Sequence, residues 1–255
     1  FFNGERLAVP KSSLSEVVIF NRPTFGVEHG WQRYKTGFLP KKIETAKLVC
    51  QEADPNLLDS FIFDLRRTFS WENSEQMPRY IGMLIQPMIA HLSTGQNPAY
   101  AILGPTKSGK GYLSSVLPAI LYSRIGDQTV LVKKMPNSTY EMEVFLANCL
   151  EALFLCLDEV KNASDEEFKM IDAMCTQETL QTRVMRQGYH EIPNLITICM
   201  TAVHQNFTDE TYGRLALIKL SESRSDAVAE FHTRWKDRGA ELLTAIFLRL
   251  QNVDF

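Results

Sequence analysis

The sequence lacks three features, each of which would have placed it in a specialised class of protein. No apolar run approaches the roughly 20 residues of a membrane-spanning helix, and no secretory signal peptide is visible. The five cysteines include no C-x-x-C pair, which argues against a cysteine zinc site and is typical of a reducing compartment. We therefore expect a cytoplasmic protein without a membrane partner.

The sequence also lacks a strong excess of charge of either sign. Its formal net charge is −3 over 255 residues, so no global basic field predicts a nucleic-acid partner. A ring or groove that binds DNA needs only a local positive lining, and the weak net charge does not exclude it. With 45% hydrophobic residues, the chain can form one large core, or a main domain with a small appendage. Because it begins with Phe1 rather than Met, we expect it to be a piece of a longer polypeptide.

Composition and periodicity divide the chain into three parts. Residues 1–40 are rich in proline, glycine and aromatic residues without a sustained period, which predicts an irregular lead-in or linker. Residues 41–96 carry apolar side chains at helical spacing and predict a small helical subdomain. Over residues 97–255, short apolar runs alternate with helical stretches, which predicts an α/β domain whose parallel sheet is covered by helices on both faces.

The third part contains the elements of this predicted sheet. Its strands are expected at residues 99–103, 129–134, 153–159, 195–202 and 215–220. Its helices are expected at residues 110–122, with a bend at Pro118, at residues 138–152, and at residues 229–251 as one or two helices.

The stretch GPTKSGKG, residues 104–111, fits the phosphate-loop pattern G-x-x-x-x-G-K. Backbone N–H groups of such a loop approach phosphate oxygens closely, at the positive end of the following helix. The stretch follows a predicted strand and opens a predicted helix, as this mechanism requires, which favours it over a chance glycine-rich turn. We predict that Lys110 reaches the β and γ phosphates of a nucleotide. The predicted binding residues are Gly104, Pro105, Thr106, Lys107, Ser108, Gly109, Lys110, Gly111 and Tyr112.

Gly111 stands where the pattern asks for Ser or Thr, whose hydroxyl binds Mg²⁺. Mg²⁺ readily keeps several waters, so a water can fill the missing position. Adenylate kinases also carry GKG here, but with Thr next, where this chain has Tyr112. This departure from the phosphate-loop pattern leaves the predicted nucleotide site in place. It bears on how tightly the site binds the metal and on the rate of hydrolysis.

An acidic pair, Asp158 and Glu159, ends the strand predicted at residues 153–159. Ligands of open α/β sheets bind at the edge formed by the carboxyl ends of the strands. We predict that Asp158 holds Mg²⁺, directly or through water, and that Glu159 orients and deprotonates an attacking water. Without the phosphate loop, the simpler interpretation would be an acidic cap before a turn. A second carboxylate suits a hydrolysing motor better than a kinase.

Two more positions complete the pattern. The strand at residues 195–202 ends in polar residues that include Thr201 and His204, and Arg214 precedes the strand at residues 215–220. With this order of motifs, residues 40–250 resemble the helicase ATPase domain of phage, plasmid and viral primase-helicases, in superfamily 3 of the AAA+ class.

The resemblance implies a P-loop NTPase fold, the cofactors ATP and Mg²⁺, and a ring, usually hexameric, with ATP between subunits. It implies that Thr201 or His204 contacts the γ-phosphate and attacking water, and that Arg214 is an arginine finger offered to the neighbouring subunit. A surface salt bridge is the alternative for Arg214. The implied partners are single-stranded or forked DNA, other copies of the chain, and an upstream primase or polymerase module in the full-length protein.

In similar helicases, the interval at residues 181–194 carries a hairpin or loop that projects basic residues into the channel. Arg183 and Arg186 are the candidates here, with Lys133 and Lys134 at the end of another strand. A solvated surface is the alternative for all four residues.

Two other functions stay open from the sequence. A nucleotide or small-molecule kinase rests on the GKG sequence alone, and no basic lid or acceptor pocket is evident. An ATP-gated assembly platform with weak hydrolysis would follow if Gly111 impairs turnover, although the presence of Glu159 speaks against it.

Overall fold

A computed structural model gives the structure of the chain, and it describes residues 6–10, 17–21, 54, 56–89, 98–122, 130–133, 152–160, 165–177, 179–184, 188–194, 196–203, 207, 209–222 and 225–250. Within these residues, no helix is long and apolar enough to cross a membrane. The helix predicted at residues 138–152 lies outside the described part of the chain.

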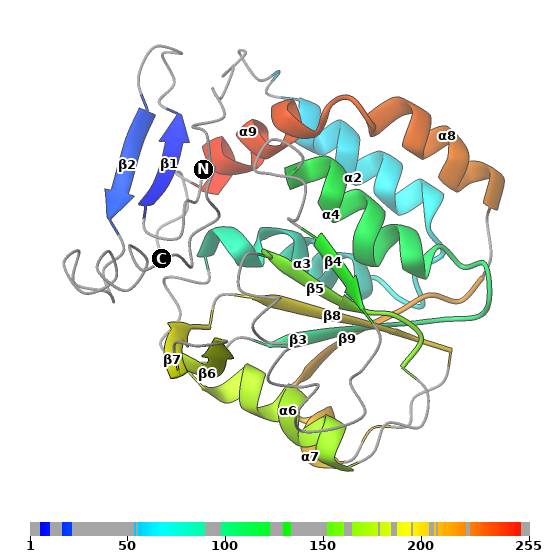
Figure 1. Cartoon of the computed structure of the whole chain (residues 1–255). Coiled ribbons are helices and arrows are strands. Elements are labelled where there is room, and N and C mark those ends of the chain that lie inside the picture. Colours follow the sequence, from blue (N-terminus) through cyan, green and yellow to red (C-terminus); the bar gives the residue numbers. More distant parts are fainter. Residues whose placement is uncertain are drawn as a thin grey trace.

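A five-stranded parallel sheet forms the centre of the molecule (Figure 1). All of its neighbouring strands pair in parallel, so the predicted α/β fold class is confirmed. The five strands lie within the predicted ranges or match them. In spatial order they are β4 (Val130–Lys133), β5 (Phe154–Leu157), β8 (Thr197–Ala202), β3 (Ala99–Leu103) and β9 (Leu215–Lys219).

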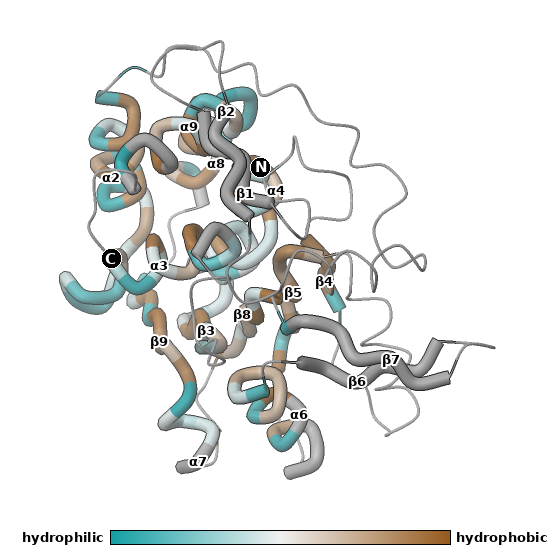
Figure 2. Tube along the Cα trace, turned by 90° about the vertical axis from the view of Figure 1, so that its left-hand side faces the viewer, coloured by the Kyte–Doolittle hydropathy of each residue, from teal (hydrophilic) through white to brown (hydrophobic). Residues whose placement is uncertain are grey.

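Alternate side chains of the strands enter two separate cores, because successive residues of a strand point to opposite faces. On β3, Tyr100 and Ile102 join one core, whereas Ala99, Ala101 and Leu103 join the other. Both faces are therefore covered, and the apolar strands β5 and β8 appear brown in Figure 2.

The larger core joins one face of the sheet to helices from both halves of the chain. These are α2 (Leu57–Thr68), α3 (Gln76–Ile89), α4 (Leu117–Tyr122), α8 (Ser225–Trp235) and α9 (Gly239–Leu250). The smaller core packs the other face against α6 (Asp165–Thr176), close to the short helix α7 (Asp209–Tyr212) (Figure 1).

The helix α2 shows how an N-terminal helix joins the larger core, where Phe61 meets Phe231 and Trp235 of α8. Leu57, Phe61 and Leu65 recur at four-residue spacing and are buried, which aligns them on one face. Asp54 Oδ1 accepts a hydrogen bond from the backbone N–H of Asn56 just before the helix begins. The predicted helical character is confirmed for Leu57–Thr68 and Gln76–Ile89, whereas the predicted domain boundary at residue 97 stays a prediction.

The helix that follows the phosphate-loop sequence contains an irregular turn. Residues Tyr112–Val116 form a π-helical segment, η2, and the backbone N–H of Leu117 donates to Tyr112 O. The irregularity comes just before Pro118, which has no N–H to continue the α-helical pattern. The helix predicted at residues 110–122 is confirmed, with this change in its hydrogen bonding.

Two hairpins lie outside the central sheet. The strands β1 (Arg6–Pro10) and β2 (Val17–Asn21) pair antiparallel, so the prediction of an irregular lead-in is wrong at these residues. The run VVIFN is rich in β-branched residues, which favour strands. The strands β6 (Thr179–Val184) and β7 (Gly188–Pro193) form the second antiparallel hairpin, in the interval where a hairpin was expected.

Candidate nucleotide-binding site

The loop at residues 104–111 leaves the carboxyl end of β3, which lies between β8 and β9. Its shape requires glycine at two positions. Gly109 has φ 92°, and a Cβ there would meet Phe69 Cε1 at 2.7 Å. A Cβ on Gly104 would meet Ser108 Oγ at 2.9 Å and Leu220 O at 3.0 Å. Gly109 is therefore needed for its left-handed backbone, and Gly104 is needed for close packing.

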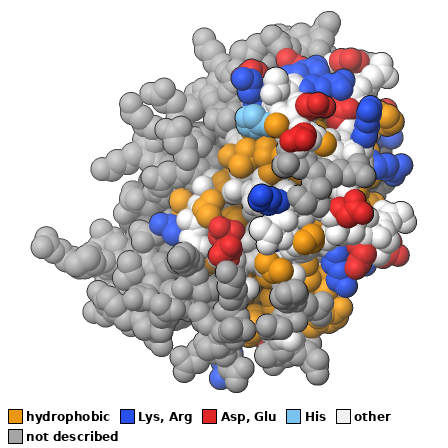
Figure 3. Space-filling view, turned by 90° about the vertical axis from the view of Figure 1, so that its right-hand side faces the viewer, with side chains coloured by type: hydrophobic (Ala, Val, Ile, Leu, Met, Phe, Trp, Pro, Cys, Tyr) orange, Lys and Arg blue, Asp and Glu red, His pale blue; other side chains and the backbone are white. Residues whose placement is uncertain are grey.

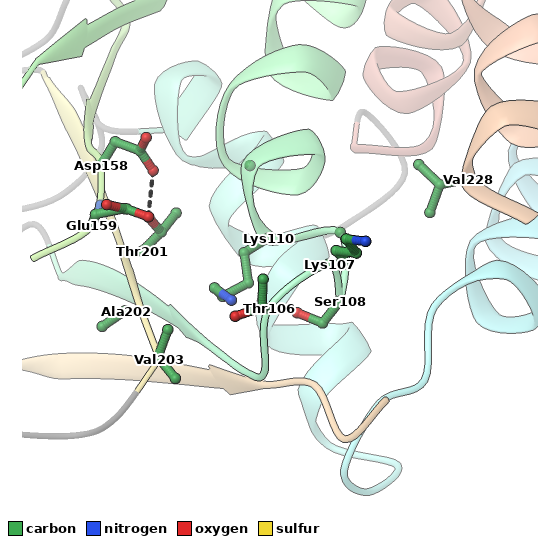
Figure 4. A pocket seen from close by; sticks show the side chains of 12 residues that line it. Thr106, Lys107, Ser108, Lys110, Asp158, Glu159, Thr201, Ala202, Val203 and Val228 are labelled. Carbon is green, nitrogen blue, oxygen red and sulfur yellow. Dashed lines mark hydrogen bonds between the residues drawn. The ribbon is translucent and has the colours of Figure 1, made fainter. Parts of the chain in front are cut away.

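A pocket of about 420 Å³ opens beside this loop (Figure 4). Three segments from the carboxyl edge of the sheet line it together with α8: the loop itself, the turn after β5, and the end of β8. Its lining residues are Thr106, Lys107, Ser108, Gly109, Lys110, Gly111, Asp158, Glu159, Thr201, Ala202, Val203 and Val228. The loop and the acidic pair, which are far apart in the sequence, thus face the same space.

Thr201 ties the acidic pair to the sheet. Its hydroxyl donates to Asp158 Oδ1 at 2.7 Å and accepts from the backbone N–H of Glu159 at 2.9 Å. Thr201 O also accepts from Val160 N at 2.9 Å. The register that pairs Leu157 with Met200 brings Thr201 beside the turn. Because one buried hydroxyl contacts both acidic residues, their positions are linked.

Glu159 adopts a left-handed backbone, with φ 52°. For a residue with a side chain, this conformation is unfavourable by roughly 1–2 kcal/mol, and such conformations persist where the surroundings impose them. The hydrogen bond to Thr201 is one such constraint. Glu159 is exposed and lines the pocket.

The ammonium group of Lys110 lies inside the loop, where Nζ donates to Gly104 O at 2.6 Å and to Pro105 O at 2.7 Å. Burial lowers the pKa of Lys110, whereas the carboxylates of Glu159 and Asp158 oppose that shift. To contact a phosphate, Nζ must replace at least one of these carbonyl oxygens by a phosphate oxygen. The two hydrogen bonds to Gly104 O and Pro105 O hold the positive charge of Lys110 at the centre of the predicted phosphate site.

Tyr112, which sequence reasoning included among the nucleotide contacts, is not among the residues that line the pocket. Its ring stacks on Phe69 at 6.1 Å between centroids and meets Phe231 edge-on at 6.0 Å. Its hydroxyl lies 3.3 Å from His232 Nδ1, and burial raises its pKa. The ring therefore joins the loop helix to α8.

The donors at the pocket suit Mg²⁺ that is also bound to phosphates. No three His, Cys, Asp or Glu side chains in the described ranges form a group that could hold a metal by themselves. Mg²⁺ typically uses one or two protein carboxylates together with phosphate oxygens and waters. Asp158 can fill that role, because a carboxylate that accepts one hydroxyl keeps further lone pairs.

Arg214 lies at the opposite edge of the sheet from the pocket. Leu215, beside it, pairs with Ala99 at the start of β3, and Lys219 pairs with Leu103 at its end. Four residue steps of about 3.3 Å, roughly 13 Å, separate the two edges. Arg214 Nη1 is 3.6 Å from Asp172 Oδ1 on α6. The structure therefore does not bring Arg214 to the pocket of its own chain.

The predicted DNA contacts are only partly described. Lys133 is exposed at the carboxyl end of β4, and Arg183 lies on β6, where it pairs with Tyr189 of β7. Arg186, Lys134 and His204 lie outside the described residues. Figure 3 views the face at which the loop lies and shows side chains of both charges interspersed there.

Sequence reasoning missed the support beneath the loop. Phe69 contacts the Gly109 position from the segment after α2, and Val228 of α8 closes one side of the pocket. Neither residue belongs to a motif. The only available indication was that both are apolar residues close to helices with an apolar stripe.

Comparisons with known proteins add little about function. No model of a known protein family matches the sequence, and no curated protein matches it. Three apo structures of the NrS-1 C-terminal region share 14%, 14% and 16% identity with it, at TM-scores of 0.48, 0.44 and 0.45. The matches cover 74%, 73% and 74% of this chain but only 44%, 45% and 44% of those chains, so this chain spans less than half their length. A similarity of this degree carries no argument about function.

Proposed function

We propose that the protein hydrolyses ATP at this pocket, as the motor of a DNA helicase that acts in replication as an oligomeric ring. One observation carries the proposal: the loop GPTKSGKG and the pair Asp158–Glu159 face the same pocket from the carboxyl ends of β3 and β5. Phosphate binding and water activation need these two groups on either side of the reacting phosphorus.

Each residue then has a role in hydrolysis. Backbone N–H groups of the loop bind the phosphates, and Lys110 moves from the Gly104 and Pro105 carbonyls onto phosphate oxygens. Asp158 would hold Mg²⁺, which neutralises charge on the phosphates. Glu159 accepts a proton from the attacking water. Thr201 holds the Asp158 carboxylate and the backbone N–H of Glu159 in place.

The place of Arg214 supports a ring. On the far edge of the sheet, it can reach a pocket only in another copy of the chain, where its guanidinium would neutralise charge on the transferred phosphoryl group. In this assembly, its ion pair with Asp172 at 3.6 Å would be exchanged for the neighbour's phosphate.

DNA contact is proposed for the β6–β7 hairpin and the end of β4. Arg183 on β6 and Lys133 at the end of β4, together with Arg186 and Lys134, would neutralise backbone phosphates. Affinity for single-stranded DNA should therefore fall as the salt concentration rises. Removing charge at these positions should make the slope of log affinity against log salt concentration less steep.

The test is phosphate release from ATP and Mg²⁺, with and without single-stranded DNA. We expect turnover that DNA stimulates, loss of turnover in Lys110→Ala, and ATP that is bound but not cleaved in Glu159→Gln. Stimulation by a small phosphate acceptor in place of DNA would instead indicate a kinase. Unchanged turnover in Lys110→Ala would contradict the proposed site.

A mixing experiment tests the role of Arg214 between subunits. Lys110→Ala lacks a working pocket but keeps Arg214, whereas Arg214→Ala keeps the pocket. Each variant alone should be inactive, and a mixture should regain activity, since mixed rings contain intact pockets beside intact arginines. Activity in Arg214→Ala alone would exclude the finger at this residue.

Gly111 favours a second candidate, an ATP-gated assembly platform with weak hydrolysis, because it removes the hydroxyl that usually binds Mg²⁺. Tight ATP binding, ATP-dependent oligomers and no phosphate release with DNA would favour the platform over the motor.

A further inference from the structure

Gly111 occupies an ordinary helical position with open space around it. Its backbone has φ −61° and ψ −34°, and a Cβ placed on it would meet nothing within 4 Å. The residue is exposed and lines the pocket. Neither backbone conformation nor packing requires glycine here, in contrast to Gly104 and Gly109.

Of the three nearby serine hydroxyls, two donate to the backbone and the third is buried. Ser114 Oγ donates to Gly111 O at 3.3 Å, and Ser115 Oγ donates to the same oxygen at 2.8 Å. Ser108 Oγ is buried, so solvent does not reach it in this conformation. None of these three groups replaces a hydroxyl on the pocket side of Gly111.

Without a hydroxyl at Gly111, a bound metal would contact the protein mainly from the Asp158 side of the pocket. Asp158, anchored by Thr201, is a ligand that remains. Lys110 and the loop N–H groups bind phosphate without requiring a metal. The groups that bind the nucleotide and those that would bind the metal are thus largely separate.

We propose that Gly111 uncouples nucleotide binding from Mg²⁺, so that the loop binds a nucleoside triphosphate almost equally well with and without the metal, which is needed for hydrolysis alone. The inference rests on the proposed function. Coupling between two ligands is reciprocal, so binding to the protein changes the nucleotide's own affinity for Mg²⁺ equally little. The open position makes a serine there sufficient to restore coupling.

The test measures the affinity of a fluorescent, non-hydrolysable ATP analogue in Mg²⁺ and in EDTA at equal ionic strength. Wild type and Gly111→Ala should change by less than about 3-fold between the two buffers, whereas Gly111→Ser should change by about 10-fold or more, within the usual range of coupling between sites. Gly111→Ala is the matched control, because it adds the Cβ without the hydroxyl. Both substitutions fit the helix, so thermal unfolding should show no loss of stability.

Two results would overturn the inference: a wild-type ratio already near that of the serine variant, or a serine variant that behaves like the alanine one. In the first case, a lower ratio in Thr106→Val would identify that pocket hydroxyl as the metal ligand. Failure of the proposed function looks different, since wild type would then bind no nucleotide in either buffer, or Lys110→Ala would bind it as tightly as wild type.

Discussion

Replacing Thr201 by valine tests the link between the acidic pair and β8. Valine keeps the shape of threonine but cannot donate to Asp158 Oδ1 or accept from Glu159 N–H. The residue is 2% exposed, so the pocket gains no room for a compensating water. We expect the fold to persist and the acidic turn to loosen.

The magnitude follows from the two hydrogen bonds. A hydrogen bond to a charged group contributes about 1.5–3 kcal/mol and one between neutral groups about 0.5–1.5 kcal/mol. Because Asp158 and Glu159 are exposed, water recovers part of this loss, and we expect destabilisation of about 1–2 kcal/mol. The left-handed turn at Glu159, unfavourable by roughly 1–2 kcal/mol, then loses one of its constraints and can relax.

The assays are urea unfolding, nucleotide affinity and steady-state hydrolysis. Thr201→Val should keep nucleotide affinity within about 3-fold but lose about 10-fold to 100-fold in kcat, since 1.36 kcal/mol of transition-state stabilisation is tenfold in rate. Thr201→Ser restores the hydroxyl and should recover most of the activity. Wild-type kcat in Thr201→Val, with stability reduced as expected, would refute the view that this hydroxyl positions the acids.

Two further substitutions test the support of the site and of the core. Gly109→Ala should lose about 2–4 kcal/mol of stability and most nucleotide binding, because alanine is unfavourable at φ 92° and its Cβ would meet Phe69 at 2.7 Å. Wild-type values for Gly109→Ala in urea unfolding and in nucleotide binding would show that the loop does not need this geometry. Asp64→Ala should lower the free energy of unfolding by about 1–3 kcal/mol, measured by urea unfolding, because Trp235 Nε1, which donates to Asp64 at 3.0 Å, stays buried without that acceptor. Asp64→Asn keeps an acceptor and should lose less, whereas an equal loss in both variants would assign the effect to the ion pair with Arg234 at 2.9 Å.

The sequence predicted those parts of the site whose groups are consecutive. The strand β3, the loop at residues 104–111 and the following helix form one uninterrupted segment with a recognisable pattern. The pair Asp158–Glu159 likewise follows its own strand directly. Local pattern and mechanism agree in both cases, so fold class and loop placement could be predicted without tertiary information.

The contacts between segments could not be predicted in this way. From the sequence, Thr201 and His204 were equal candidates, and only the pairing of β5 with β8 shows that Thr201 lies beside the acidic turn. The packing of Phe69 under Gly109 joins two segments with no shared pattern. The aromatic contacts of Tyr112 depend on where α8 lies. Each of these features is set by tertiary packing, which periodicity does not encode.

The order of the strands also has a consequence for synthesis of the chain on the ribosome. β3 precedes the loop at residues 104–111, and among the described strands it pairs with β8 and β9. Both are made about a hundred residues later, so the pairing of β3 has a high contact order. Until then, the apolar run AYAIL has no partner in the sheet. We expect the nascent chain to need protection of this segment against aggregation, and a chain that stops before β8 to lack a nucleotide pocket.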